Sequence, residues 1–265
     1  MHRLFFRLVL LVAVIGLSAC ATPAPDATRA RLAALPPVDV ILLGEQHDAD
    51  AHHQLQREVV GQLAATRRLA ALAMEMAEQG RDTRSLPASA SEAQVQQALG
   101  WNDQAWPWAR YGPVAMAAVR AGVPVLGANL PRAAMRNAMS DTSLDGQLPG
   151  PALKAQQQAI RLGHCNLLPE SQITPMTRIQ IARDRAMADT VRAAAREGQV
   201  VVLVAGAGHV DRSLGVPRHL PAALRLQAVR LQAGETADRI GVFDATWHTP
   251  ALPEQDHCAS LRPAG

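Results

Sequence analysis

The stretch "VILLGEQHDADAHH" at positions 40–53 joins a buried-type strand to a concentration of ionisable side chains. An apolar run stops at Gly44, and one glutamate, two aspartates and three histidines follow within ten residues. An apolar run without alternation is typical of a strand covered on both faces, as in a parallel sheet. We therefore expect the chain to leave a buried strand at this point and to enter a functional site.

Three more runs share the apolar character of the first, 38–43, and they lie at 69–76, 123–130 and 200–208. Segments with helical period separate them: Leu55, Val59 and Leu63 recur every four residues, and a longer segment, 173–198, ends at Gly198. Strands that alternate with helices predict an α/β fold with a mostly parallel central sheet flanked by helices and a helical insertion. Two later alternating runs, 224–232 and 239–247, are predicted to pair as an edge hairpin.

The first twenty residues have the layout of a secretory signal peptide. Arg3 and Arg7 precede an apolar stretch, and the segment ends in Leu17-Ser18-Ala19-Cys20, the lipobox of bacterial lipoproteins. Cleavage before Cys20 would leave an acylated cysteine that anchors the chain stably in a lipid bilayer. Ala21 favours the outer membrane of a Gram-negative bacterium; the alternative is an ordinary signal peptide with a chance cysteine.

These features divide the chain into four parts. Residues 1–19 are expected to be the signal peptide, 20–37 a lipidated N-terminus with a Pro/Ala-rich tether, 38–250 the α/β domain, and 251–265 a C-terminal tail. Of the three cysteines, Cys165 and Cys258 remain after lipidation. They either form a disulfide that ties the tail to the domain or stay free thiols. The net charge of +3 is modest and no basic run is interleaved with aromatics, so nucleic acid is not an expected partner.

Polar residues follow the ends of all four strands, and parallel strands end at one edge of the sheet. Two G-x-x-H segments, Gly44 to His47 and Gly206 to His209, are the main signal, since glycine permits a sharp turn and histidine suits acid/base work and metal ligation. Glu45, Glu75 and Arg132 lie at neighbouring strand ends. With them, the set could hold a divalent metal through His47, His209 and Glu75, activate water, or recognise a polar ligand. The alternative is that the histidines are turn residues with satisfied hydrogen bonds.

The two adjacent histidines of the first helix are assigned to different faces. His52 shares the stripe of Leu55 and Val59, which favours packing as much as function, whereas His53 is predicted to face solvent or a partner. Asp48 or Asp50 is expected to cap this helix.

The long helix and the aromatic residues each allow two interpretations. Gln180, Arg183, Asp184 and Met187 form a stripe that either lines the site or is an exposed, salt-bridged face. The aromatic residues Trp101, Trp106, Trp108 and Tyr111, the only tyrosine, form either a lid or ligand platform or a small local core.

The chain resembles the ChaN-like haem-binding lipoproteins of the Tiki superfamily, which also includes erythromycin-esterase-like hydrolases and Tiki-type metalloproteases. The stretches that carry the resemblance, over about residues 38–229, are "LLGEQHDADAHHQLQ", "MEM", "YGPVAMAAVRAGVPVLGANLPR", "HC" at 164–165, "QIARDRAMA" and "AGAGHVDRSLGVP".

The resemblance implies an outer-membrane lipoprotein that binds haem for iron uptake, with a homodimer as one arrangement. It implies Tyr111 as the phenolate ligand of ferric iron, supported by His52, His164 or His209, although a purely structural tyrosine is the alternative. The competing hypothesis is a hydrolase in which His47 and His209 act as bases or metal ligands, Glu45 or Glu75 activates water, and Arg132 stabilises negative charge. The sequence has no G-x-S-x-G elbow, which argues against a serine hydrolase of the α/β-hydrolase kind.

Overall fold

The computed structural model describes residues 25–236 and 242–259 and confirms the predicted α/β fold. Its helices are α1 Pro25–Ala34, α2 Asp50–Ala65, α3 Glu92–Leu99, α4 Trp108–Arg120, α5 Met135–Ser140, α6 Gly150–Gly163 and α7 Glu170–Ala194. Four short 3₁₀ helices are η1 Arg132–Ala134, η2 Thr142–Gly146, η3 Ala207–Val210 and η4 Val216–His219. The strands are β1 Val40–Glu45, β2 Leu69–Glu78, β3 Val125–Asn129, β4 Val200–Gly206, β5 Leu226–Ala233 and β6 Ala245–Thr249.

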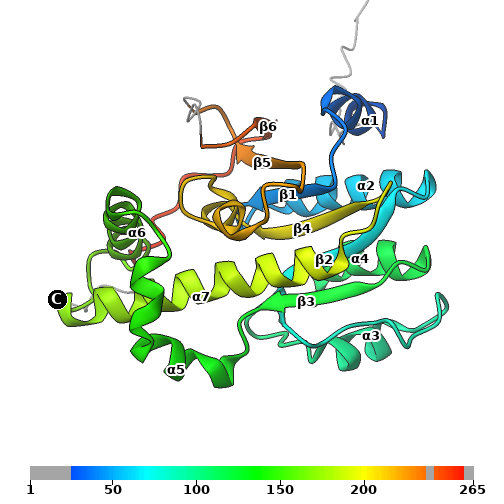
Figure 1. Cartoon of the computed structure of the whole chain (residues 1–265). Helices are drawn as coiled ribbons and strands as arrows, with labels where there is room; N and C mark the ends of the chain where they lie inside the picture. Colours follow the sequence, from blue (N-terminus) through cyan, green and yellow to red (C-terminus); the bar gives the residue numbers. More distant parts are fainter. Residues whose placement is uncertain (1–24, 237–241, 260–265) are drawn as a thin grey trace, which may run out of the picture.

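The six described strands form one sheet in the order β3-β2-β4-β1-β5-β6, and every neighbouring pair is parallel. The apolar strands β1, β2, β3 and β4 lie together because only strands covered on both faces can be apolar throughout. Helices α2 and α4 cover one face, and α3 packs against α4. Helix α7 crosses the other face, where Met187 and Val191 belong to the core. Figure 1 shows α7 in front of the sheet with α2 and α4 behind it. The predicted helical insertion is the segment from η1 to α6, between β3 and α7.

The predicted edge hairpin is wrong in its strand direction. Strands β5 and β6 are neighbours, but they pair in parallel with Val229 opposite Ala245. Alternation of apolar and polar residues reports that one face is buried and carries no information on direction. A two-residue turn cannot join parallel strands, and the connection from Ala233 to Ala245 is accordingly longer.

Part of the predicted tether is ordered. Helix α1 packs on α2, where Thr28 is fully buried and donates a hydrogen bond to Glu58, and Leu32 contacts the main core. Arg31 donates to the backbone oxygen of His248 at 3.0 Å and lies 5.9 Å from the Trp247 ring centroid. The proline and alanine content that predicted a tether is compatible with a helix whose stability comes from tertiary packing. The signal peptide and Cys20 lie outside the described residues.

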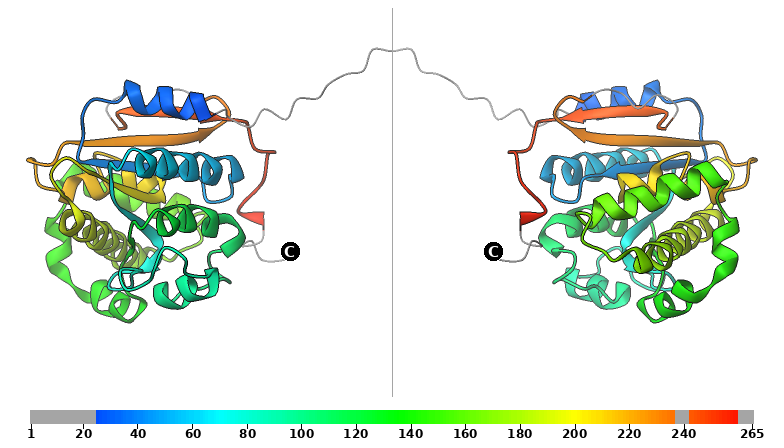
Figure 2. Two further views of the ribbon diagram at one scale, coloured as in Figure 1. Left: turned by 90° about the vertical axis from the view of Figure 1, so that its right-hand side faces the viewer. Right: turned by 90° about the vertical axis from the view of Figure 1, so that its left-hand side faces the viewer.

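The C-terminal segment returns to the domain through a disulfide between Cys165 and Cys258, whose Cα atoms are 5.7 Å apart. His257 directly precedes Cys258, and its Nε2 lies 3.7 Å from Asp48 Oδ2 in the loop after β1. The tail therefore runs beside the carboxyl edge of the sheet (Figure 2). Within the described residues, no helix has the length and apolar character that crossing a membrane requires.

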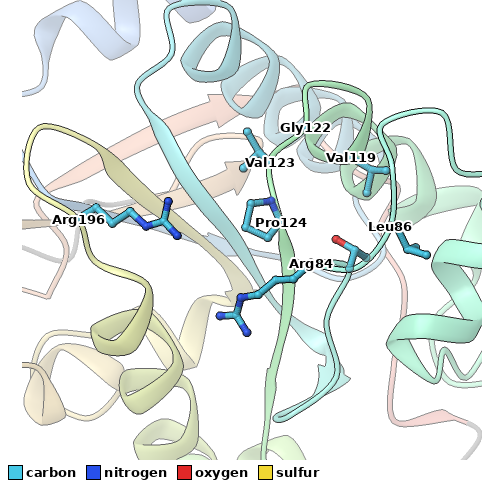
Figure 3. Close-up of a pocket in the computed structure, with 8 residues that line it drawn as sticks. Arg84, Leu86, Val119, Gly122, Val123, Pro124 and Arg196 are labelled. Atoms are coloured by element: carbon cyan, nitrogen blue, oxygen red, sulfur yellow. The ribbon is translucent and has the colours of Figure 1, made fainter.

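The opposite edge of the sheet differs in chemistry. A hollow of about 130 Å³ opens near the start of β3 (Figure 3). Its lining residues are Thr83, Arg84, Leu86, Val119, Gly122, Val123, Pro124 and Arg196. No histidine or carboxylate lines this hollow, in contrast to the carboxyl edge, where β1 ends in Glu45.

Candidate functional site

Strand register brings the chemistry-bearing residues of three strands together. Glu45 at the end of β1 is paired with Gly206 at the end of β4, and Met74 of β2 is paired with Val204, which puts Glu75 one step further along. Their positions in the chain are far apart, but parallel pairing aligns the carboxyl ends of the strands. The prediction that these strand ends converge is confirmed for Glu45, Glu75, His47 and His209.

The first group, here called the Glu45 cluster, consists of Glu45, His47, His53, Gln56 and Tyr111. Glu45 Oε1 lies 2.8 Å from His47 Nδ1 and accepts a hydrogen bond from the Tyr111 hydroxyl at 2.7 Å. Its other oxygen accepts from Gln56 Nε2 and lies 3.6 Å from His53 Nε2. The His53 and Tyr111 rings meet edge to face, with centroids 4.6 Å apart. Both oxygens of this buried carboxylate thus have partners.

The partners of Glu45 determine its charge. Burial alone would raise the pKa of the Glu45 carboxyl, but the hydrogen bond with His47 and the charges of His47 and His53 outweigh it and lower the pKa to about 2. Burial disfavours the charged form of His47, yet the hydrogen bond to Glu45 and the charge of Glu75 raise the His47 pKa above its ordinary value. Burial, followed by the charge of Glu45, raises the pKa of Tyr111. The cluster therefore contains an ionised carboxylate and a neutral phenol at neutral pH.

The second group, here called the His209 cluster, consists of His209, Glu75, Asp184 and Gln180. His209 Nδ1 lies 2.5 Å from Asp184 Oδ1, and His209 Nε2 lies 3.4 Å from Glu75 Oε1. Gln180 Nε2 lies 3.1 Å from His209 Nδ1, and the backbone N–H of Gly206 donates to Glu75 Oε2 at 2.8 Å. The stripe of α7 therefore lines the site through Gln180 and Asp184 and is not an exposed salt-bridged face.

Two neighbouring carboxylates stabilise the protonated form of His209. Burial opposes protonation, but the charges of Glu75 and Asp184 outweigh it and raise the His209 pKa to about 10. Burial is also outweighed at Glu75, where the charge of His209 lowers the pKa to about 2. At Asp184 burial dominates over the attraction of His209 and raises the pKa to about 6. At neutral pH, His209 is accordingly a fixed imidazolium between two carboxylates and does not act as a proton acceptor.

The two clusters meet over Gly206. A Cβ at this position would lie 2.9 Å from His47 Nε2 and 3.7 Å from Glu75 Oε2. Gly44 is equally constrained, because its Cβ would lie 2.1 Å from Val210 Cγ2 and 2.9 Å from Ala207 Cα. Neither glycine has a positive φ. The expectation that they provide sharp turns is thus wrong, and their lack of a side chain instead permits close approach by the neighbouring strand end.

Of the two histidines of α2, His53 departs from the sequence-based expectation and His52 agrees with it. His53, predicted to face solvent or a partner, is buried because α4 packs against that side of α2 and places Tyr111 over the ring. His52 is also buried; its Nδ1 accepts a hydrogen bond from the Gln46 N–H at 3.0 Å, and burial lowers its pKa to about 4. Neither aspartate caps α2, since Ala49 is the N-cap residue.

Besides His52, two residues selected from the sequence, His164 and Arg132, lie outside these clusters. His164 ends α6, where its Nδ1 lies 2.9 Å from the Ile160 carbonyl oxygen. Arg132 is exposed; its backbone N–H donates to Glu78, and in the described parts of the chain its guanidinium makes no hydrogen bond to either cluster. Gln56 was missed by the sequence analysis, although it lies three residues after His53 and four after His52, a spacing that shares a helix face.

The predicted metal set is not assembled in the structure. Among the described residues, no group of three or more His, Cys, Asp or Glu side chains has an arrangement that could hold a metal ion. The physical reason is that His209 and Glu75 already neutralise one another, and the Gly206 N–H occupies the other Glu75 oxygen.

The tryptophans extend the main core towards the site. Trp108 is buried, with its indole N–H donating to Glu92 at 2.8 Å, and Trp101 packs edge to face on it. Trp106 is half-buried and contacts both His47 and Tyr111, with ring centroids 5.0 and 5.8 Å away. The aromatic region is therefore core for the most part, and Trp106 alone of the three flanks His47.

Comparisons with known proteins agree with this fold. A family model described as "Haem-binding uptake, Tiki superfamily, ChaN" matches residues 31–220. The solved structure titled "Cofacial heme binding to ChaN of Campylobacter jejuni" is 25% identical, with a TM-score of 0.67, and the match covers 81% of this chain and 88% of that one. The type III effector HopBA1 is 18% identical over the same shares, with a TM-score of 0.45. None of the curated proteins matches the chain significantly.

Proposed function

The chain belongs to the haem-binding uptake family of the Tiki superfamily, ChaN, and we infer from this membership that its ligand is haem. The likeness to a ChaN structure whose title names cofacial haem binding supports the same ligand. The question for this chain is which of its own side chains fit haem iron.

His47 fits best, and its environment is the observation that carries the proposal. Its side chain is 43% exposed, whereas the His209 side chain is only 7% exposed. In the neutral imidazole, the Nδ1–H bond to Glu45 orients the ring and leaves Nε2 as the nitrogen with a free lone pair, an arrangement that usually accompanies metal-ligating histidines. Trp106 provides an aromatic surface beside the ring. Haem bound here would supply a ferric iron for His47 to ligate.

Tyr111 fits less well as the iron ligand. It is 1% exposed, and its hydroxyl donates to Glu45 at 2.7 Å. Its raised pKa disfavours the phenolate that would have to ligate iron. We propose instead that Tyr111 positions the Glu45 carboxylate, which in turn orients the His47 ring. His52 and His209 are also buried and are not assigned as ligands.

The cellular role follows as a further part of the proposal. The lipobox before Cys20 supports a lipid-anchored protein of the outer membrane, and haem binding at a membrane surface suits iron uptake. The cofacial haem of the Campylobacter protein supports a homodimer in which two copies bring their haem faces together. Palmitate labelling lost in Cys20→Ala tests the anchor, and the solution mass with and without haem tests the dimer.

A hydrolase finds less support. The sequence-based scheme needs His209 as a base, but the two carboxylates keep it protonated at neutral pH. It also needs Arg132 over the site, and among the described residues the Arg132 guanidinium makes no hydrogen bond to either cluster. The His209 cluster is better suited to holding β2, β4 and α7 together.

Titration of the purified protein with ferric haem tests the proposal. We expect a saturable Soret shift, and His47→Ala should weaken haem binding by about a hundredfold, at the upper end of losses caused by disturbing a metal's surroundings. His164→Ala, a histidine outside the clusters, is the control and should bind as the wild type does. Haem binding that survives in His47→Ala with an unchanged spectrum would refute His47 as the ligand.

A further inference from the structure

A hollow of about 500 Å³ lies between the first turns of α2 and α4, behind the Glu45 cluster. Its lining residues are Asp50, His53, Gln54, Arg57, Ala109, Arg110 and Pro113. Two of its side chains are arginines and one is a buried histidine, a combination that neither the haem proposal nor the core requires.

His53 lies at the inner end of this hollow. Its side chain is 5% exposed, and neither ring nitrogen has a hydrogen-bond partner. Nε2 faces Glu45 Oε2 at 3.6 Å, and Nδ1 faces Asp50 Oδ1 at 3.9 Å, on the outer side. A buried polar atom without a partner is costly, so the Nδ1 side of the ring favours a polar ligand atom in the hollow.

Arginine side chains give the hollow its charge. Arg110 Nε lies 3.3 Å from Asp50 Oδ1, so this carboxylate oxygen already lies between a guanidinium and the His53 ring. The Asp50 side chain is 75% exposed and can move away. Arg57 is exposed and makes no ion pair within the described residues. The hollow thus has room and charge for a second carboxylate, which a guanidinium can bind through two parallel hydrogen bonds.

We propose that this hollow is a carboxylate-binding site in which Arg57, Arg110 and the Nδ1 side of His53 hold the ligand carboxylate, and Asp50 competes with it. The ligand is either a free small carboxylate or the propionate arm of a haem. The site does not depend on haem being the cargo of the protein, because a free carboxylate tests it directly. The His53 ring would then separate the bound carboxylate from Glu45, the residue that orients His47.

Succinate is the first probe. Calorimetric titration of the full-length protein should show saturable binding, and the His53 imidazole proton resonances, assigned among nine histidines by their absence in His53→Gln, should shift with it. Arg57→Gln and Arg110→Gln should each weaken binding about tenfold, as expected for losing a charge-assisted hydrogen bond. Asp50→Asn should strengthen it.

Arg120→Gln is the matched control, because Arg120 is an exposed arginine at the other end of α4. It should bind succinate as the wild type does. Equal affinity in Arg57→Gln, Arg110→Gln and Arg120→Gln, or His53 resonances that do not move, would overturn the proposal. All these arginines are at the surface, so the variants should fold, and circular dichroism checks that they do.

Haem and its dimethyl ester then distinguish the two sources. If the propionates use the site, esterification weakens haem binding, succinate competes with haem, and Arg57→Gln weakens haem but not its ester. If the ligand is a free carboxylate, haem and ester bind alike and succinate does not compete. Each result supports the site and names its source. Failure of haem to bind at all would refute the proposed function and leave the succinate result intact.

Discussion

The two G-x-x-H segments place their histidines in contrasting surroundings. His47 has one carboxylate partner, Glu45, and a side chain that is nearly half exposed, whereas His209 is enclosed between Glu75 and Asp184. The difference comes from what covers each strand end: α7 lies across β4 and contributes Asp184, while Trp106 and the Tyr111 hydroxyl lie beside His47 and leave its side chain 43% exposed. The same sequence pattern therefore gives an accessible ligand at one strand end and a structural ion cluster at the other.

The largest effect is expected on removing the charge of Asp184. Asp184→Asn should lower the free energy of unfolding by about 3–5 kcal/mol, because it breaks a buried ion pair and leaves His209 with one carboxylate. Urea unfolding measures the change. Asp189→Asn, on an exposed side of the same helix, is the control and should stay within about 0.5 kcal/mol. Similar losses in both variants would mean that the His209 cluster does not stabilise the fold.

A pH effect of a few kcal/mol should follow from the same cluster. The folded-state pKa of His209, about 10, exceeds the ordinary value of 6.5. Its stabilising contribution is therefore fully present below pH 6.5 and is lost as pH rises to about 10. Asp184, with a folded pKa of about 6, titrates mainly below this window and is almost fully ionised above about pH 7.

Thermal unfolding from pH 6.5 to 10 measures the decline. The His209→Gln variant should be less stable at pH 6.5, and most of the decline with pH should be absent from it. A smaller decline should remain from His47, whose pKa is also raised. Parallel curves for wild type and variant would contradict the assignment of a charged His209.

Alanine substitutions at Gly44 and Gly206 form a matched pair, for which we expect effects of intermediate size. Gly44→Ala should destabilise the fold by about 1–3 kcal/mol, since its Cβ would overlap Val210 and the Ala207 backbone. In Gly206→Ala the new Cβ is crowded by the far end of the His47 ring, which can move, and lies at ordinary contact distance from Glu75. We therefore expect little loss of stability but weaker haem binding. Urea unfolding and haem titration of both variants test this. The opposite pattern would mean that His47 stabilises the fold and does not bind haem.

The smallest effect on haem binding is expected at Tyr111. Tyr111→Phe removes a hydrogen bond to a charged acceptor and should lower stability by about 1.5–3 kcal/mol at most. Because Glu45 keeps His47 and Gln56 as partners, we expect a value at the lower end and an unchanged Soret maximum. A shifted maximum with haem bound would identify the phenolate as the iron ligand, as the family resemblance first implied.

Local pattern was sufficient for most of the fold. The continuous apolar strands and the helical period between them predicted a parallel α/β sheet, and strand-end chemistry predicted the convergence of Glu45, Glu75, His47 and His209. The predicted stripe on α7 contained both of the α7 residues that contact His209, Gln180 and Asp184. These predictions succeeded because both features can be read directly from the sequence. Strands buried on both faces are continuous apolar runs, and the residues that follow parallel strands meet at one edge of the sheet.

The failures concern contacts between distant segments. The burial of His53 depends on α4, the direction of β6 on a crossover, and the order of α1 on its packing against α2. Periodicity describes one element at a time and cannot say which other element covers it.

The sequence by itself therefore determined the class of fold, the edge of the sheet where the chemistry lies and the residue types available there. Only the tertiary structure decided which histidine is accessible and which is enclosed, and that the glycines serve close approach and not turns. The physical reason is that exposure and pKa depend on the surrounding charges and on solvent, and these surroundings come from residues far away in the chain.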